Sequence, residues 1–212
     1  DYKNVGRANS YREYFGVIPN CVQSYIAIKK ISSMDKFQNK YRIPSSRLQN
    51  WNYGSPGLYF ITVCTKNRKH YFGEIINGEM MLNEIGIFVH SEWIKTPGIR
   101  PDMNLELGEF VVMPNHFHGI MIIGENEFNG RDAMHRVSTS PKNKFGPQSK
   151  NLGSIMRGFK SAVTTHSKIL NIEFGWQAGF HDHIICSHEE FIRISKYILT
   201  NPAKWKDDRF FT

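Results

Sequence analysis

The chain has 212 residues, enough for one domain with extensions or for two small domains. Its 27 lysines and arginines exceed its 19 aspartates and glutamates, and the resulting net charge of +8 favours a polyanionic partner such as nucleic acid. No apolar run approaches the ~20 residues of a membrane-spanning helix. The 3 cysteines form no Cys-x-x-Cys pair, so neither a zinc ribbon nor a disulfide framework is indicated. We therefore expect a cytoplasmic protein without a membrane partner.

Residues 1–33 show no clean hydrophobic period, and we expect them to form an N-terminal extension. The extension is either dispensable or a short accessory element that packs its aromatic residues onto the domain. We expect a single domain over residues 34–212, with a long loop at 124–150 where the composition turns to Gly, Asn, Ser, Pro and Lys. Such a loop either closes over bound nucleic acid or is an insertion without a role.

Hydrophobic patterns predict four main strands, at 58–65, 105–113, 116–123 and 176–185. Three helices are predicted at 84–96, at 151–168 and from Ser187 to Asn201. A small hairpin is expected around Asn77-Gly78. The order strand, helix, strand, strand, helix, strand predicts an α+β fold, a ferredoxin-like or RRM-like βαββαβ sandwich. Such folds typically have a central antiparallel sheet with helices on one face. The last predicted helix, which carries Tyr197, follows the βαββαβ order as an additional C-terminal element.

A pair of histidines begins the third predicted strand. Side chains alternate along a strand, so His116 and His118 point to one face while Phe117 points to the core. Two imidazoles on one face are the minimum for a divalent-cation site with open positions. The alternative is a pair of hydrogen-bonded surface histidines, and we expect both rings to face outward. His181 and His183 repeat the spacing, but a carboxylate separates them where a buried strand would place an apolar residue.

The segment 113–120 (MPNHFHGI) resembles the His-hydrophobe-His signature of the HUH single-tyrosine transposases, and in particular the REP-associated tyrosine transposases of bacteria. The resemblance continues through Trp176-Gln177, 182–185 (DHII) and 197–202 (YILTNP), in the same order, over roughly residues 41–207. It implies that His116, His118 and Asn201 bind a metal ion and that Tyr197 is the nucleophile. Tyr197 and Asn201 are four residues apart and therefore share one helix face.

The resemblance implies a DNA transposase-like endonuclease that acts on hairpin-containing single-stranded DNA. Attack by Tyr197 on a phosphodiester would leave a 5′-phosphotyrosine and a free 3′-hydroxyl, and a second strand end could reverse the attack and rejoin the DNA. The expected cofactor is Mg²⁺ or Mn²⁺, because phosphoryl chemistry favours the first and two imidazoles suit the second. His183 is a candidate proton carrier or extra ligand, although a hydrogen-bonded strand histidine is its commoner role.

Basic residues on the predicted helices are candidates for phosphate contacts, although a solvated charged face is the commoner explanation; they are Arg157, Lys160, Arg193 and Lys196. Lys196 or Arg193 could also favour the phenolate of Tyr197. Two other functions stay open: a DNA or RNA hairpin-binding module of the same fold that does not cleave, and a metal-dependent phosphodiesterase that uses water. The sequence does not decide between a monomer and a homodimer.

Overall fold

The computed structural model describes residues 51–126 and 150–212. The expected extension at 1–33 and all but the ends of the expected loop at 124–150 lie outside these residues. The division of the chain into an extension and a single domain therefore stays a prediction.

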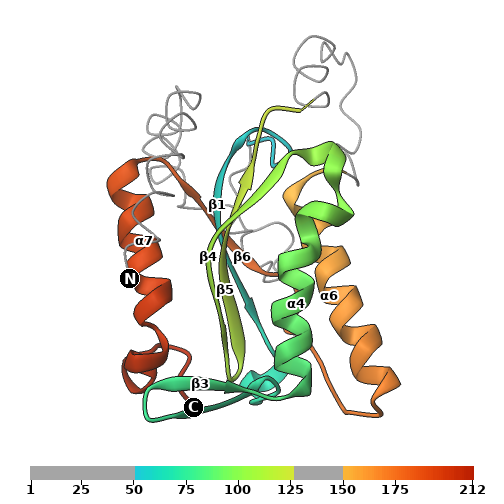
Figure 1. Ribbon diagram of the computed structural model, residues 1–212, viewed down its shortest axis with the longest axis vertical. Helices are drawn as coiled ribbons and strands as arrows, with labels where there is room; N and C mark the ends of the chain where they lie inside the picture. The colour runs from blue at the N-terminus through green and yellow to red at the C-terminus, as the bar shows by residue number, and fades with distance from the viewer. Residues whose placement is uncertain (1–50, 127–149) are drawn as a thin grey trace, which may run out of the picture.

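A four-stranded antiparallel sheet forms the centre of the described structure (Figure 1). Across the sheet the strands are β4 (Leu105–Met113), β5 (His116–Ile123), β1 (Gly57–Cys64) and β6 (His181–Ile185). β5 and β1 are thus the central strands, and β6 is an edge. The α+β class and the central antiparallel sheet are as predicted.

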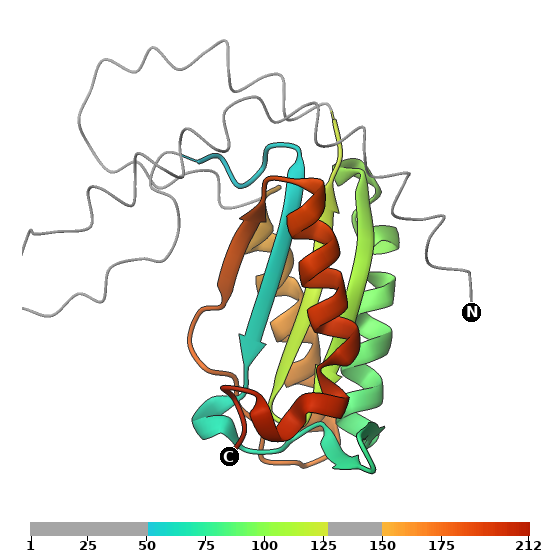
Figure 2. The ribbon, with the colours of Figure 1, turned by 90° about the vertical axis from the view of Figure 1, so that its left-hand side faces the viewer.

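Helices cover both faces of this sheet. α4 (Glu84–Ile99) and α6 (Leu152–Ile169) lie side by side on one face, and α7 (His188–Thr200) lies on the other (Figures 1 and 2). β5 is buried along its whole length because it is central and covered on both sides, which explains its nearly continuous apolar sequence. No helix in 51–126 or 150–212 combines the length and apolar content needed to cross a membrane.

Alternation along β5 divides the core in two. Phe117 packs under α4 and α6, with its ring centroid 4.7 Å from that of Trp93. Ile120 and Ile122 point the other way and pack with Ile198 of α7. The histidines share the parity of the two isoleucines, so they lie on the face that α7 covers.

Short elements complete the fold. β2 (Gly73–Ile76) and β3 (Glu79–Leu82) form the predicted hairpin, and both turn residues, Asn77 and Gly78, have the positive φ that a type I′ turn requires. Within the described residues, three 3₁₀ helices lie outside the sheet: η1 (Lys66–Arg68), η2 (Pro101–Met103) and η3 (Pro202–Asp207). After η3 the chain turns across the end of the sheet where β5 begins (Figure 2).

Two predicted boundaries are wrong. α4 continues through Pro97 to Ile99 instead of ending at residue 96. β6 begins at His181 instead of at Trp176, which makes only an isolated bridge to Thr65. Lys160 donates to two carbonyl oxygens between Trp176 and β6, and Gly179 has a φ of 72°, so this stretch is held as a loop.

Candidate metal centre and tyrosine site

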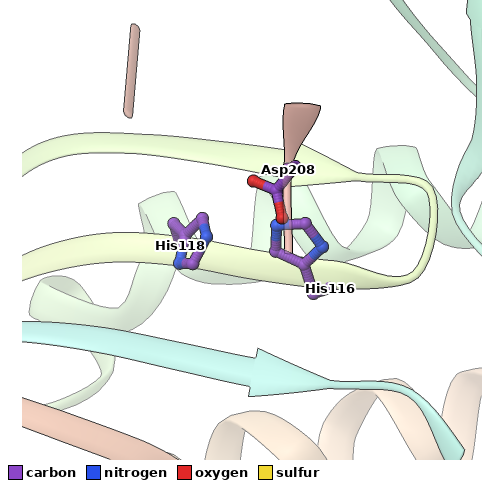
Figure 3. A group of neighbouring side chains, drawn as sticks. All are labelled: His116, His118 and Asp208. Atoms are coloured by element: carbon purple, nitrogen blue, oxygen red, sulfur yellow. The ribbon is translucent and has the colours of Figure 1, made fainter. Parts of the chain in front are cut away.

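The histidine pair meets the C-terminal part of the chain on the α7 face of the sheet. His116 and His118 come from the start of β5, Tyr197 from the last turn of α7, and Asp208 from the residues after η3. One ligand atom of each histidine and a carboxylate oxygen of Asp208 all lie within 4.8 Å of one another. Figure 3 shows the Asp208 carboxylate beside the two imidazoles.

The ring orientation of His116 is fixed by the neighbouring residue. Nδ1 of His116 lies 2.9 Å from Oδ1 of Asn115, whose Nδ2 donates to the Phe210 carbonyl at 2.9 Å. An amide oxygen only accepts, so His116 donates from Nδ1 and keeps a lone pair on Nε2. That Nε2 is buried and has no hydrogen-bond partner in the described structure. A metal-binding histidine has this arrangement, in which the second nitrogen is anchored to the protein.

His118 is held at both nitrogens. Nδ1 lies 2.8 Å from the Thr62 hydroxyl, and Nε2 lies 3.2 Å from the Tyr197 hydroxyl. A hydroxyl can donate or accept, so Thr62 can serve either tautomer of the ring. His118 Nε2 can therefore carry a proton toward Tyr197 or present a lone pair.

Both imidazoles are buried, and the expectation that they face outward is wrong. His116 is 0% exposed and His118 is 1% exposed, because α7 and the chain after η3 cover this face. Burial, with the nearby charges of Arg68 and Arg209, lowers the pKa of His116 to about 3. Burial also lowers the pKa of His118 well below its ordinary value. Both rings are neutral at physiological pH, which is the state that binds a metal ion.

Tyr197 is 40% exposed and points its hydroxyl into the site. The hydroxyl donates to Asp208 Oδ2 at 3.2 Å. Burial, and then the charge and hydrogen bond of Asp208, raise the pKa of Tyr197 to about 12. The phenol is therefore protonated at neutral pH, with a carboxylate placed to receive its proton.

Asn201 caps the C-terminus of α7 and reaches the same carboxylate. Its Nδ2 donates to Asp208 Oδ2 at 2.8 Å, and its Oδ1 is buried without a hydrogen-bond partner in the described structure. Two buried acceptors, His116 Nε2 and Asn201 Oδ1, thus lack a hydrogen-bond donor. Such atoms are costly to bury unpaired, and coordination of a cation is one way to satisfy a lone pair of this kind.

Asp208 is the member of the site that sequence reasoning missed. It lies one residue beyond the end of the family resemblance, in a segment without hydrophobic period. Its Oδ1 accepts from the Phe210 backbone at 2.6 Å, which holds the carboxylate in place. The sequence feature that could have indicated a carboxylate ligand is the acidic pair Asp207-Asp208, but the sequence does not show which of the two faces the histidines.

Two of the four basic residues predicted to contact DNA lie beside this site. Arg193 and Lys196 line a cleft of about 290 Å³ together with Tyr197 and Lys204. Arg157 and Lys160 lie on α6, on the opposite face of the sheet. Lys160 donates to the carbonyls of Gln177 and Gly179 at 2.8 and 2.7 Å, which is a structural role.

His183 lies on the α7 face but does not join the cluster. Its Nε2 is 2.8 Å from Oε1 of Glu190, near the N-terminal end of α7. Glu190 also accepts from the Cys186 backbone and from Arg193. The structure thus places His183 in a hydrogen-bond network at one end of α7, and His116 and His118 near the other end.

Comparison with known proteins gives one close relative in sequence. An uncharacterized protein of Haemophilus influenzae is 37% identical over 171 residues, which cover 79% of this chain and 92% of that protein. The chain belongs to the same family as this protein. No established family model matches the chain.

The solved structures that are similar to this chain include two transposases. One is a REP-associated tyrosine transposase bound to a REP hairpin, with a TM-score of 0.47 and 19% identity over 81% of this chain and 74% of that one. The other is a candidate transposase from Deinococcus radiodurans, with a TM-score of 0.35 and 14% identity over 78% of this chain and 96% of that one. Both TM-scores lie below 0.5.

Proposed function

We propose that the protein is a metal-dependent HUH endonuclease with a transposase-like activity, which nicks and rejoins single-stranded DNA through Tyr197. The observation that carries the proposal is the position of the Tyr197 hydroxyl, 3.2 Å from His118 Nε2 and 3.2 Å from Asp208 Oδ2. A nucleophile, a proton acceptor and a cluster of metal ligands thus meet at one point. We assign the sheet and its helices to the ferredoxin-like α+β fold.

His116, His118 and Asp208 would hold the divalent ion, with Asn201 Oδ1 as a further donor. The two orphaned acceptors and the neutral histidines fit such an ion. A mixed set of nitrogen and oxygen ligands suits Mn²⁺, and Mg²⁺ is the abundant alternative. A bound ion would polarise a phosphate oxygen and orient the group for in-line displacement.

The side chains supply the rest of the reaction. Tyr197 Oη forms the new bond to phosphorus while the bond from phosphorus to the 3′-oxygen breaks, and the 3′-oxygen takes a proton from water. Asp208 Oδ2 receives the phenol proton, since it already accepts a hydrogen bond from Tyr197. The product is a 5′-phosphotyrosine, which keeps the bond energy for rejoining.

The proposed DNA substrate contains hairpins with single-stranded flanks. The signature at residues 113–120, the YILTNP segment and the net charge of +8 support this substrate. Arg193, Lys196 and Lys204 border the cleft beside Tyr197, where they can contact phosphates on either side of the cut.

A metal-dependent phosphodiesterase that uses water is the second candidate. The raised pKa of Tyr197 favours it, because a phenol with a pKa of about 12 is a weak nucleophile until its proton is removed. In that case Tyr197 would position water or phosphate and would never be modified.

A labelled hairpin oligonucleotide with a single-stranded flank, taken from the DNA next to the gene, separates the two candidates. Incubated with Mn²⁺ or Mg²⁺ and run on a denaturing gel, it should form a covalent species with the wild-type protein. Tyr197→Phe should form none and should not cleave, and EDTA should abolish both products. Cleavage that survives in Tyr197→Phe would support the water-dependent phosphodiesterase instead.

A further inference from the structure

A second cleft, of about 380 Å³, lies on the same face of the sheet between β1, β6 and the chain after η3. Its walls include an aromatic ring, two guanidinium groups and two polar side chains: Phe60, Arg68, Arg209, Thr62 and His181. The cleft adjoins the candidate metal centre, because Thr62 contacts His118, and Asp208 of the centre is followed directly by Arg209. Nothing in the chemistry proposed above uses this cleft.

Phe60 connects the cleft to the reacting groups. Its ring is stacked on that of His118 with 5.2 Å between centroids, and its edge-to-face contact with Tyr197 measures 6.3 Å. Phe60 is only half-buried, although it lies on a central strand, so part of its ring faces the cleft. An aromatic group stacked on that part would therefore lie beside Tyr197.

Two arginines give the cleft its charge. The guanidinium carbons of Arg68 and Arg209 each lie 4.5 Å from the ring centroid of Phe210, and Arg68 Nη1 donates to the Arg209 carbonyl at 3.2 Å. These contacts hold both planar groups at the cleft wall, where each can bind a phosphate through two N–H groups.

We propose that this cleft is a subsite for one unpaired nucleotide next to the scissile phosphate, with its base stacked on Phe60 and its phosphate bound by Arg68 and Arg209. A cleft of about 380 Å³ is large enough for one nucleotide. Stacking on an aromatic ring beside a basic wall is the usual means of binding single-stranded nucleic acid. The exposed His181 offers hydrogen bonds to the edge of the base, and thus a means of base preference. This inference rests on the proposed function and deepens it.

The test measures binding without cleavage, in a Tyr197→Phe background and without added metal. Hairpin oligonucleotides carry a single abasic site that is moved along the single-stranded flank, and fluorescence anisotropy gives the affinity of each. One flank position should be sensitive, with affinity falling about 5- to 150-fold, the range that base–aromatic stacking provides. In Phe60→Leu the intact oligonucleotide should bind more weakly by a similar factor, and the same abasic site should have no further effect.

Matched variants control for damage to the fold. Phe60→Tyr keeps the ring and should retain the sensitive position. Phe211→Leu removes an exposed ring outside the cleft, so it should change neither the affinity for the intact oligonucleotide nor the effect of the abasic site. Arg68→Gln and Arg209→Gln should each reduce the slope of log affinity against log salt concentration by about one phosphate contact.

The experiment distinguishes failure of the subsite from failure of the proposed tyrosine chemistry. A flank without any sensitive position, or a sensitive position that persists in Phe60→Leu, overturns the subsite even if the wild-type protein forms the covalent species. A sensitive position that depends on Phe60 in a protein that never forms the covalent species supports the subsite and overturns the tyrosine chemistry.

Discussion

Two histidine pairs of equal spacing lie on the same face of the sheet in different surroundings. His116 and His118 occupy a central strand under α7 and are buried, whereas His181 and His183 occupy the edge strand β6, where His181 is exposed. Each pair has a carboxylate nearby. Glu190 bonds directly to His183 Nε2, but Asp208 bonds to Tyr197 and Asn201 and leaves His116 Nε2 open.

The comparison shows that spacing alone does not make a metal site. Both pairs satisfy the alternation of a strand, and both have partners that fix a ring. A site also needs a nitrogen lone pair that no protein donor occupies, in a place where water does not compete. Only the β5 pair offers this in the described structure. Changes to the two pairs should therefore have unequal effects.

The largest contrast is expected from removing one imidazole of each pair. His116→Ala or His118→Ala should reduce adduct formation by about 100-fold or more, because the ion loses a ligand. His181→Ala should change it at most several-fold. A denaturing gel measures the covalent adduct, and calorimetric titration measures the Mn²⁺ affinity of the same variants. An equal loss of adduct formation in His118→Ala and His181→Ala would contradict the assignment of the metal site to the β5 pair alone.

Stability should also distinguish the two pairs. Because the imidazoles of β5 are buried, His118→Ala leaves the Thr62 hydroxyl without its partner and should cost about 1–3 kcal/mol of unfolding free energy. His181→Ala removes an exposed side chain and should cost less than about 0.5 kcal/mol. Urea unfolding measures both values.

The carboxylate beside the β5 pair is the next point of contrast. Asp208→Asn should slow adduct formation by about 10²- to 10⁴-fold, because the phenol loses its proton acceptor and the ion a ligand. Asp207→Asn is the matched control, since Asp207 is exposed and is not one of the clustered ligands. Single-turnover rates would show the difference, and an Asp208 variant as fast as the Asp207 variant would exclude Asp208 from the chemistry.

A smaller effect is expected from the groups that orient the rings. Thr62→Val replaces the hydroxyl that contacts His118 Nδ1 with a methyl group of similar size. Loss of such a partner typically lowers metal affinity about 10- to 100-fold. The counterpart on the other pair, Glu190→Gln, should leave Mn²⁺ affinity unchanged. Calorimetric titration gives the Mn²⁺ affinity of both variants. Weaker binding in Glu190→Gln than in Thr62→Val would show that the ion is not bound by the β5 pair.

The smallest effect concerns pH and the metal-free protein. Burial, followed by the charges of Arg68 and Arg209, lowers the pKa of His116 from 6.5 in the unfolded chain to about 3 in the folded protein. Between these values the unfolded chain binds the additional proton, so stability should increase with pH across this window. The loss on going from pH 7 to pH 5 should be smaller in His116→Ala, as urea unfolding would show. An unchanged pH dependence in that variant would mean that His116 is protonated in the folded protein.

Much of this arrangement follows from local sequence. The alternation around Phe117 predicts the common face of His116 and His118, and the four-residue spacing of Tyr197 and Asn201 predicts their common position near the end of α7. The Asn77-Gly78 turn predicts the hairpin. Each of these depends on a period or a turn residue within a few positions.

The rest depends on contacts between distant segments. Asp208 reaches the histidines because η3 turns the chain back and because Asn115 donates to the carbonyl of Phe210. The same turn buries the imidazoles that the sequence predicts to face outward. No local pattern encodes a bond between residues 115 and 210, so neither the carboxylate nor the burial could be predicted.

Peptide mapping by mass spectrometry can test our claim that Tyr197 Oη becomes bonded to DNA. Wild-type protein is incubated with Mn²⁺ and the hairpin oligonucleotide, digested with a protease and a nuclease, and compared with Tyr197→Phe. Loss of one hydroxyl should cost only ~1 kcal/mol of stability, so the variant remains a folded control. We predict that a nucleotide phosphate is attached to the wild-type peptide that contains Tyr197 and is absent from the variant. Cleaved DNA without any modified peptide, or a modification at another residue, would contradict the claim.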